Sequence, residues 1–180
     1  INGGDIREHS LEEHRRRFGF VLQDVSVMTR SLGENIRFDR DISRQRISEA
    51  LEQVNGTEIV ERQKLGLDEP MMERGRTLSS GERQLISFAR ALAGDPEVLV
   101  LDEATSHVDT ETESKIQEAI DRMVEGRTSV IVAHRLSTVR KADRILVLHH
   151  GHLRESGTHD ELVDKGGIYA RLVKLPFQSR

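Results

Sequence analysis

The chain has 180 residues, a formal net charge of −4 at pH 7 and 32% charged residues, which is the composition of an ordinary soluble domain with a sizeable core. We expect neither a membrane-spanning helix, which needs roughly 18 consecutive apolar residues, nor a secretory signal. The absence of cysteine excludes disulfides and cysteine-based metal sites. The mild acidity gives no reason to expect nucleic acid as a partner.

Short β-branched runs alternate with amphipathic helical segments along the chain. Strands are predicted at 17–23, 97–102, 128–133 and 144–149. The second and third are nearly continuous in apolar residues, which is typical of parallel strands covered on both faces. Between them, a helix at 110–124 carries one apolar stripe made of Ile116, Ala119, Ile120, Met123 and Val124. Strand, helix and strand in this order predict a right-handed crossover in an α/β fold.

The pattern changes between residues 24 and 95, where strand signals fade. Helices are predicted there at 43–54, 57–65 and 81–93. We therefore expect a helical subdomain, 24–95, inserted into an α/β core made of 1–23 and 96–180.

The C-terminal part contains further short elements. A short polar strand is predicted after Gly151, then a helix capped by Thr158 and Glu161, and a last helix at 168–174. His149, His150 and His152 surround the Gly151 turn. Because side chains alternate between the faces of a strand, a solvated hairpin is favoured over a metal site.

The strand at 97–102 ends in two adjacent carboxylates, Asp102 and Glu103. Open α/β folds bind their ligands at this carboxyl edge of the sheet. The first acid can hold Mg²⁺, and the second can act as a general base that polarises an attacking water. For the strand and its acids alone, an acidic first helical turn stabilised by the helix dipole is an equally good interpretation.

A second motif, Leu78–Leu92, places hydroxyl groups before a strongly helical run. Ser79, Ser80 and Gly81 bring hydroxyls and free backbone N–H groups to a helix N-terminus, which is an anion site. A capping box between Ser79 and Glu82 also explains these residues, and both uses are compatible because they need different donors.

Two further polar side chains, Gln23 and His134, stand at the ends of predicted strands. There an amide and an imidazole can orient a water molecule and touch a terminal phosphate. Either residue alone is more often structural.

Together and in this order, the motifs resemble those of the nucleotide-binding domain of ATP-binding-cassette (ABC) transporters, in particular exporters with membrane and ATPase parts in one polypeptide. "VLQD" resembles the Q-loop, "ERG" the X-loop, "LSSGE" the LSGGQ signature, "LVLDEAT" the Walker B strand, "SHVDTETE" the D-loop and "IVAHRLSTV" the switch-histidine loop. The resemblance runs from Ile1 to about Gln178. It implies an incomplete P-loop NTPase (RecA-like) three-layer core with a parallel sheet, plus the inserted α-helical subdomain.

The resemblance implies a role for each motif residue in binding and hydrolysing ATP with Mg²⁺. The catalytic residues would be the general base Glu103, the phosphate contact His134 and the water sensor Gln23. Asp102 would hold the metal, with Gln23 sensing it. The residues that bind ATP across a head-to-tail dimer would be Ser79, Ser80, Gly81, Glu82 and, along the interface, Asp109.

The implied partners are a second nucleotide-binding domain and a transmembrane domain, at the cytoplasmic side of the cell membrane. Gln23 and Glu73-Arg74-Gly75 would face the transmembrane domain. Two signature positions depart from the family pattern: Ser80 replaces a glycine, and Glu82 replaces a glutamine and brings an acid close to a phosphate. The helix dipole and an N3-capping role would offset part of that charge. His107 is a further unusual residue in the D-loop.

The P-loop pattern G-x-x-x-x-G-K-[ST] does not occur, and the chain contains no Gly-Lys dipeptide. We expect that the chain begins after the P-loop and that it does not hydrolyse ATP alone. The alternative is a non-enzymatic module that contributes its signature helix to a partner's ATP site. A chromosome-maintenance or DNA-repair ATPase is disfavoured, because the 54 residues between Gln23 and Leu78 lack the heptads of a coiled coil.

Overall fold

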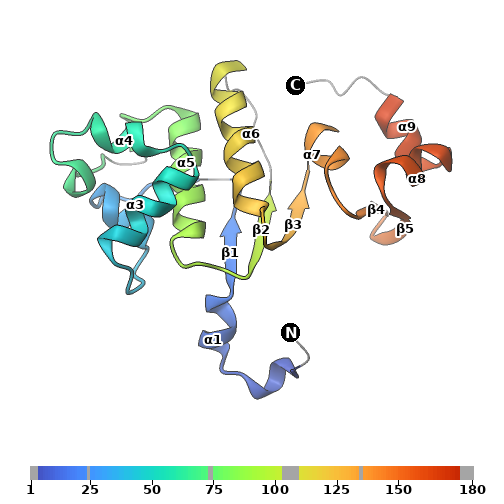
Figure 1. Cartoon of the computed structure of the whole chain (residues 1–180), viewed down its shortest axis with the longest axis horizontal. Coiled ribbons are helices and arrows are strands. Elements are labelled where there is room, and N and C mark those ends of the chain that lie inside the picture. Colours follow the sequence, from blue (N-terminus) through green and yellow to red (C-terminus); the bar gives the residue numbers. More distant parts are fainter. Residues whose placement is uncertain (1–3, 24, 73–74, 103–109, 134–135, 175–180) are drawn as a thin grey trace. The chain divides into compact units, whose positions relative to one another are not determined.

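The computed structural model describes residues 4–23, 25–72, 75–102, 110–133 and 136–174, which form two compact units, Ile1–Ile131 and Val132–Arg180 (Figure 1). The first contains η1 (Ile6–Glu8), α1 (Leu11–Arg16), β1 (Phe18–Val21), α2 (Leu32–Arg37), α3 (Arg44–Gln53), α4 (Thr57–Glu61), η2 (Gly66–Asp68), α5 (Ser80–Leu92), β2 (Val98–Asp102), α6 (Thr110–Val124) and most of β3 (Thr128–Val132). The second contains α7 (Leu136–Arg140), β4 (Ile145–His149), β5 (His152–Gly157), α8 (His159–Asp164) and α9 (Ile168–Lys174).

A three-stranded sheet of order β1-β2-β3 forms the centre of the first unit. β1 and β2 are parallel, with Gly19 opposite Leu99 and Val21 opposite Leu101. The side chains of Val21, Leu99 and Leu101 are buried on one face of this sheet. The predicted α/β fold with a parallel sheet is confirmed.

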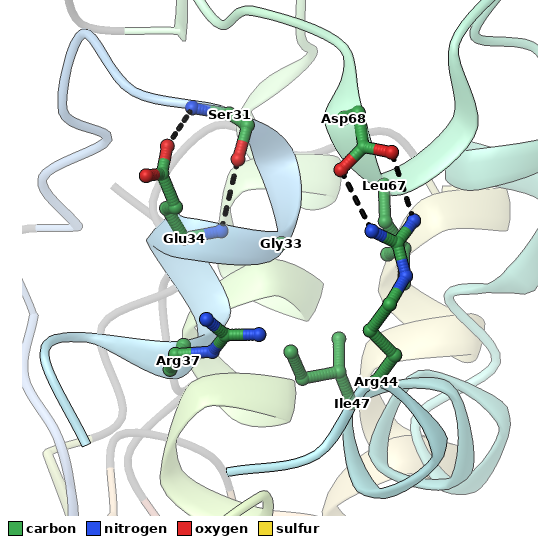
Figure 2. A pocket seen from close by; sticks show the side chains of 8 residues that line it. All are labelled: Ser31, Gly33, Glu34, Arg37, Arg44, Ile47, Leu67 and Asp68. Carbon is green, nitrogen blue, oxygen red and sulfur yellow. Dashed lines mark hydrogen bonds and ion pairs between the residues drawn. The ribbon is translucent and has the colours of Figure 1, made fainter. Parts of the chain in front are cut away.

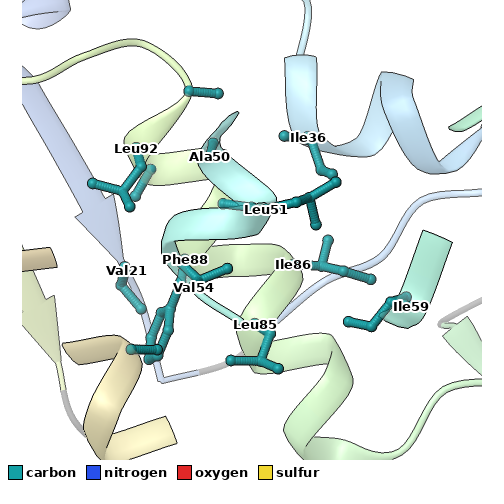
Figure 3. Close-up of a cluster of buried hydrophobic side chains, with 14 of the residues drawn as sticks. Val21, Ile36, Ala50, Leu51, Val54, Ile59, Leu85, Ile86, Phe88 and Leu92 are labelled. Atoms are coloured by element: carbon teal, nitrogen blue, oxygen red, sulfur yellow. The ribbon is translucent and has the colours of Figure 1, made fainter. Parts of the chain in front are cut away.

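Helix α5 is the centre of the packing, since it contacts α2, α3, α6 and β1. Phe88 of α5 is 1% exposed and lies in one cluster with Val21 of β1, Leu51 of α3 and Val54, which follows α3 (Figure 3). The α6 stripe is also confirmed, because Ile116, Ala119, Ile120 and Met123 are buried and Val124 packs against the same cluster. One hydrophobic core therefore joins the sheet to the helices between β1 and β2.

The expectation of coverage on both faces is wrong for β3, whereas the residues of β2 alternate between buried and half-buried. In β3, Val130 and Val132 are 55% and 54% exposed, and Phe20 of β1 is 56% exposed. Alternating side chains point to opposite faces of a sheet. Within the first unit, helices pack on the face of Leu99, and the opposite face is partly exposed among the described residues.

Several element boundaries differ from the sequence prediction. β1 ends at Val21 rather than residue 23, because the chain leaves the sheet before it enters the helical segment. α4 ends at Glu61, and turns replace the predicted end of that helix. The helices α1 and α2 were not predicted, although capping boxes of Ser10 with Glu13 and Ser31 with Glu34 begin them.

The second unit is built on the antiparallel hairpin β4–β5. His150 and Gly151 form its two-residue turn with φ of 51° and 74°, the left-handed conformation that tight hairpins require. His149 pairs with His152 across the hairpin, and no cluster of three potential metal ligands occurs among the described residues. The predicted turn between two short strands at these histidines is confirmed.

The start of α9 is stabilised by a buried carboxylate, Glu155 of β5, which is 8% exposed. Its oxygens accept hydrogen bonds from the backbone N–H groups of Ile168, at 2.7 Å, and Tyr169, at 3.0 Å. These bonds favour the ionised form and lower the pKa of Glu155 below its ordinary value of 4.5. The ionised carboxylate of Glu155 therefore connects the hairpin to the last helix through two hydrogen bonds.

This arrangement predicts that the second unit loses stability in acid. A carboxylate whose pKa is lowered by folding stabilises the protein above its unfolded pKa, and this contribution disappears as the pH falls through the folded pKa. We expect the Ile168 and Tyr169 amides to lose protection from hydrogen exchange below about pH 4.5. In Glu155→Gln, the protection at neutral pH should be lower and the acid-dependent loss smaller, as measured by NMR.

Candidate functional site

Two of the predicted site residues lie at the carboxyl edge of the sheet. Asp102 is the half-buried last residue of β2, and Gln23 is an exposed residue two positions after the end of β1. Because Val21 is opposite Leu101, the parallel register brings both side chains to the same edge. A carboxylate and an amide oxygen there are suitable ligands for a hard cation such as Mg²⁺.

The N-terminus of α5 is a complete capping box. The Ser79 hydroxyl accepts a hydrogen bond from the Glu82 backbone N–H at 3.1 Å, and Glu82 Oε2 accepts one from the Ser79 backbone N–H at 2.9 Å. Ser80, the first helical residue, is exposed. The first-turn amides of Ser80 and Gly81 have no acceptor within the helix. Together with the helix dipole, they can bind an anion.

The second carboxylate oxygen of Glu82 forms an ion pair with Arg62, the residue that directly follows α4. Arg62 also donates from Nε to the Glu58 carbonyl at 3.3 Å. The side chain of Glu82 is 21% exposed and that of Arg62 is 58% exposed. The Glu82 carboxylate thus points toward Ser79, at the N-cap of α5, and is paired with the Arg62 guanidinium. Arg62 is a residue that sequence reasoning missed, because the contact joins α4 to α5.

Gly81 is buried where α5 meets the start of α6. A β-carbon on Gly81 would lie far inside van der Waals contact with Cγ2 of Thr112 and 3.7 Å from Cδ1 of Ile116. Glycine is therefore required here by the close approach of two helices. This packing fixes the start of α5 against the helix that follows β2.

The segment after Gln23 is held by two residues that the sequence did not single out. The side chain of Asn35, which is 1% exposed, bonds to both the N–H and the carbonyl of Met28 at 2.8 and 3.0 Å. Arg90 of α5 donates to the carbonyls of Asn35 and Ser26 at 2.8 and 3.0 Å. Burial, with a smaller effect of a neighbouring guanidinium, lowers the pKa of Arg90 from its usual value. These bonds attach the segment to α2 and α5.

Gly75, the last residue of the predicted X-loop, lies beside the same segment. Its φ is 62°, and a β-carbon there would be 3.2 Å from Val27. A side chain at this position would therefore be both strained and crowded. The structure thus places the end of the X-loop next to the segment that follows Gln23.

A separate pocket of about 360 Å³ lies between α2, the start of α3 and η2 (Figure 2). Arg44 forms two hydrogen bonds with Asp68, at 2.8 and 3.0 Å, and Glu34 caps α2 through the Ser31 backbone N–H at 2.9 Å. The hydrogen bonds with Ser31 lower the pKa of Glu34, with smaller contributions from Arg30 and from Arg37, which also lines the pocket. Since its charges compensate one another, the pocket is a weak candidate for the anion site.

Glu103, His107, Asp109 and His134 lie outside the described residues, as do the X-loop residues Glu73 and Arg74. Glu103 directly follows Asp102 in the sequence. The described part of the candidate site therefore has two regions. Gln23 and Asp102, at the carboxyl edge of the sheet, carry oxygen atoms suited to a metal ion, and Ser79–Glu82, at the start of α5, can bind an anion.

A parallel α/β sheet with an acid, Asp102, at its carboxyl edge, and a helix start that can bind an anion, are features of nucleotide-binding domains. The chain belongs to the ABC transporter family, whose model, described as "ABC transporter", matches residues 1–106.

Individual relatives support this assignment. The chain is 48% identical over 180 residues, 99% of its length, to the uncharacterized ABC transporter ATP-binding protein YknV of Bacillus subtilis (strain 168). It is 48% identical over 176 residues, 97% of its length, to a probable multidrug resistance ABC transporter ATP-binding/permease protein, YheH, of the same organism. A β-(1→2)glucan export ATP-binding/permease protein, NdvA, of Bradyrhizobium diazoefficiens (strain JCM 10833 / BCRC 13528 / IAM 13628 / NBRC 14792 / USDA 110) is 46% identical over 178 residues, 98% of the chain.

A solved structure of a bacterial Atm1-family ABC exporter with ATP bound superposes with a TM-score of 0.84 at 36% identity. It covers 100% of this chain, and the chain covers 32% of that structure. The chain covers 30%, 26% and 29% of YknV, YheH and NdvA, respectively. The similarity therefore concerns less than a third of each of these proteins. None of the described helices has both the length and the apolar character needed to cross a bilayer.

Proposed function

We propose that this chain is part of the ATPase domain of an ABC exporter, which binds and hydrolyses ATP to drive transport across a membrane. One observation supports the proposal most directly. A chain of this family has both an acid, Asp102, at the carboxyl edge of its sheet and a helix start, Ser79–Glu82, that can bind an anion. The names of the relatives YheH and NdvA, both ATP-binding/permease proteins, favour the exporter type.

At the sheet edge, Asp102 and Gln23 would hold Mg²⁺, which when bound neutralises charge on the phosphates of ATP. Both side chains carry oxygen ligands, and Mg²⁺ needs only one or two protein carboxylates because phosphates and water complete its shell. Glu103 would accept the proton of the attacking water, and His134 would orient the terminal phosphate. These residues supply positioning and a proton acceptor, the main requirements of phosphoryl transfer.

At the start of α5, Ser79, Ser80 and Gly81 would contact the γ-phosphate of ATP held mainly by a second nucleotide-binding domain. Ser79 and Gly81 are supplied by a 13-residue helix that is packed on four other elements, so the donors are preorganised. Glu82 would border the site, and Asp109 would line the seam between the two domains. The domain thus works as a head-to-tail pair.

The second partner would be a transmembrane domain, which places the ATPase at the cytoplasmic side of the cell membrane. The segment after Gln23, attached to α2 and α5 by Asn35 and Arg90 and adjacent to Gly75, is the surface we propose for this contact. Its rigid attachment would transmit movement between the nucleotide edge and the membrane part.

The proposal predicts a difference between this polypeptide and the complete product of its gene. We expect the 180-residue polypeptide alone to show no MgATP hydrolysis above background, because it has no P-loop lysine or glycine-rich loop to bind the phosphates. The complete product, reconstituted in lipid vesicles, should hydrolyse MgATP, as measured by phosphate release. Turnover by the pure 180-residue polypeptide would contradict the prediction.

A second function is favoured by the absence of any Gly-Lys dipeptide in these residues. In that case the chain is a non-enzymatic module that contributes the start of α5 to a partner's ATP site. The same assay separates the two functions. A complete gene product that lacks hydrolysis alone, but stimulates a P-loop-containing partner domain, supports the module.

A further inference from the structure

We propose that Arg62 is a positioning residue for the ATP site, which holds and neutralises the Glu82 carboxylate so that the start of α5 remains able to receive a phosphate. The inference rests on the proposed function. It adds a residue that lies outside the signature stretch, at the C-cap of another helix.

Glu82 is an acid at the third position of a helix whose first-turn amides would face a phosphate. A free carboxylate so close would repel the phosphate and compete with it for the N–H groups of Ser80 and Gly81. Both of its oxygens are instead occupied. Oε2 accepts from the Ser79 backbone N–H at 2.9 Å, and Oε1 is paired with Arg62.

Arg62 is itself fixed in place. Its Nε donates to the Glu58 carbonyl at 3.3 Å, and its backbone N–H bonds to the same carbonyl at 3.2 Å. Helix α4 is attached to the core by Ile59, which is 2% exposed. The guanidinium therefore reaches Glu82 from a packed helix and keeps its carboxylate on the Ser79 side.

The exposure of the pair separates a role in nucleotide binding from a role in stability. With Arg62 58% exposed, the ion pair contributes little to folding. Its removal would leave an unneutralised acid beside the phosphate site while the Ser79–Glu82 capping box remains. This charge should weaken the binding of a phosphate, whereas the stability of the folded domain should change little.

The test uses the complete gene product and the concentration of MgATP that gives half-maximal turnover. In Arg62→Gln this concentration should rise about two- to fivefold at low salt, with a smaller change in maximal rate. Arg62→Lys, which keeps the charge, should stay close to the wild type. The increase should diminish at high ionic strength because salt screens an exposed charge.

The decisive comparison is made in a Glu82→Gln background. There Arg62→Gln should have no effect, because no charge remains to be neutralised. Arg44→Gln is the matched control, since it removes an equally exposed guanidinium bonded to Asp68 in the same helical segment. Its half-maximal concentration should not change, and urea unfolding should show similar stability for all variants.

Three results would overturn the inference: an unchanged half-maximal concentration in Arg62→Gln, the same increase in the Glu82→Gln background, or an equal increase in Arg44→Gln. Any of these in an active wild-type protein leaves the proposed ATPase function intact. A wild-type gene product without MgATP turnover, alone or with a partner domain, overturns the proposed function and the inference together.

Discussion

In the complete gene product, Glu103→Gln is expected to reduce MgATP turnover by at least about 100-fold, because glutamine cannot accept the proton of the attacking water. Binding should persist, since the residues proposed to hold the nucleotide and metal, Asp102 and Ser79–Gly81, are unchanged. We therefore expect turnover near background in phosphate release, together with normal or tighter binding of a fluorescent ATP analogue.

Glu97→Gln is the matched control for this experiment. Glu97 immediately precedes the other end of β2, and its side chain is 51% exposed and 3.7 Å from Arg17. The same chemical change there should leave turnover within about twofold of the wild type, because surface substitutions usually shift stability by less than about 0.5 kcal/mol. Retention of most of the activity by Glu103→Gln would refute the assignment of the general base.

The second large effect is expected for Gly81→Ala, through packing rather than chemistry. Alanine is the better helix former by up to roughly 1 kcal/mol, but overpacking of a tight contact costs roughly 1–3 kcal/mol. Since the added methyl would overlap Cγ2 of Thr112, we expect net destabilisation. The measurement is a lower midpoint of urea unfolding with an unchanged slope.

Thr112→Ser tests the cause of that destabilisation. The substitution removes the Cγ2 atom that the new methyl would meet and keeps the hydroxyl, and Thr112 Cβ would remain at an ordinary 3.5 Å. Combined with Thr112→Ser, Gly81→Ala should regain most of the lost stability and, if the helix start returns to its place, ATP turnover. Additive effects of the two substitutions would show that the clash is not the reason.

The pattern of elements could be predicted because it depends on local periodicity and capping. The helix at 110–124 and the last helix at 168–174 have the predicted bounds, and Thr158 with Glu161 caps α8 as expected. The capping boxes of Ser10 and Ser31 carry the same signal for α1 and α2. Those two helices have only six residues each and are too short for a recognisable apolar stripe.

Coverage of the sheet could not be read from the sequence in the same way. The apolar runs at 97–102 and 128–133 predicted strands covered on both faces, whereas Val130 and Val132 of β3 are exposed on one of them. The apolar residues of a strand show only that its faces can be buried. What covers that face depends on which other segments are present to pack on it.

The sequence by itself determined the family, the order of the motifs and the chemical type of each proposed site residue, because these depend on residue identity and spacing along the chain. Only the tertiary structure decided how Glu82, one of the two departures in the signature, is accommodated, and why the residue before it is glycine. Glu82 is bonded to Ser79 and Arg62, and Gly81 is pressed against Thr112. The Arg62–Glu82 pair spans 20 residues of sequence and the Gly81–Thr112 contact even more, so both exist only after α4, α5 and α6 have packed together.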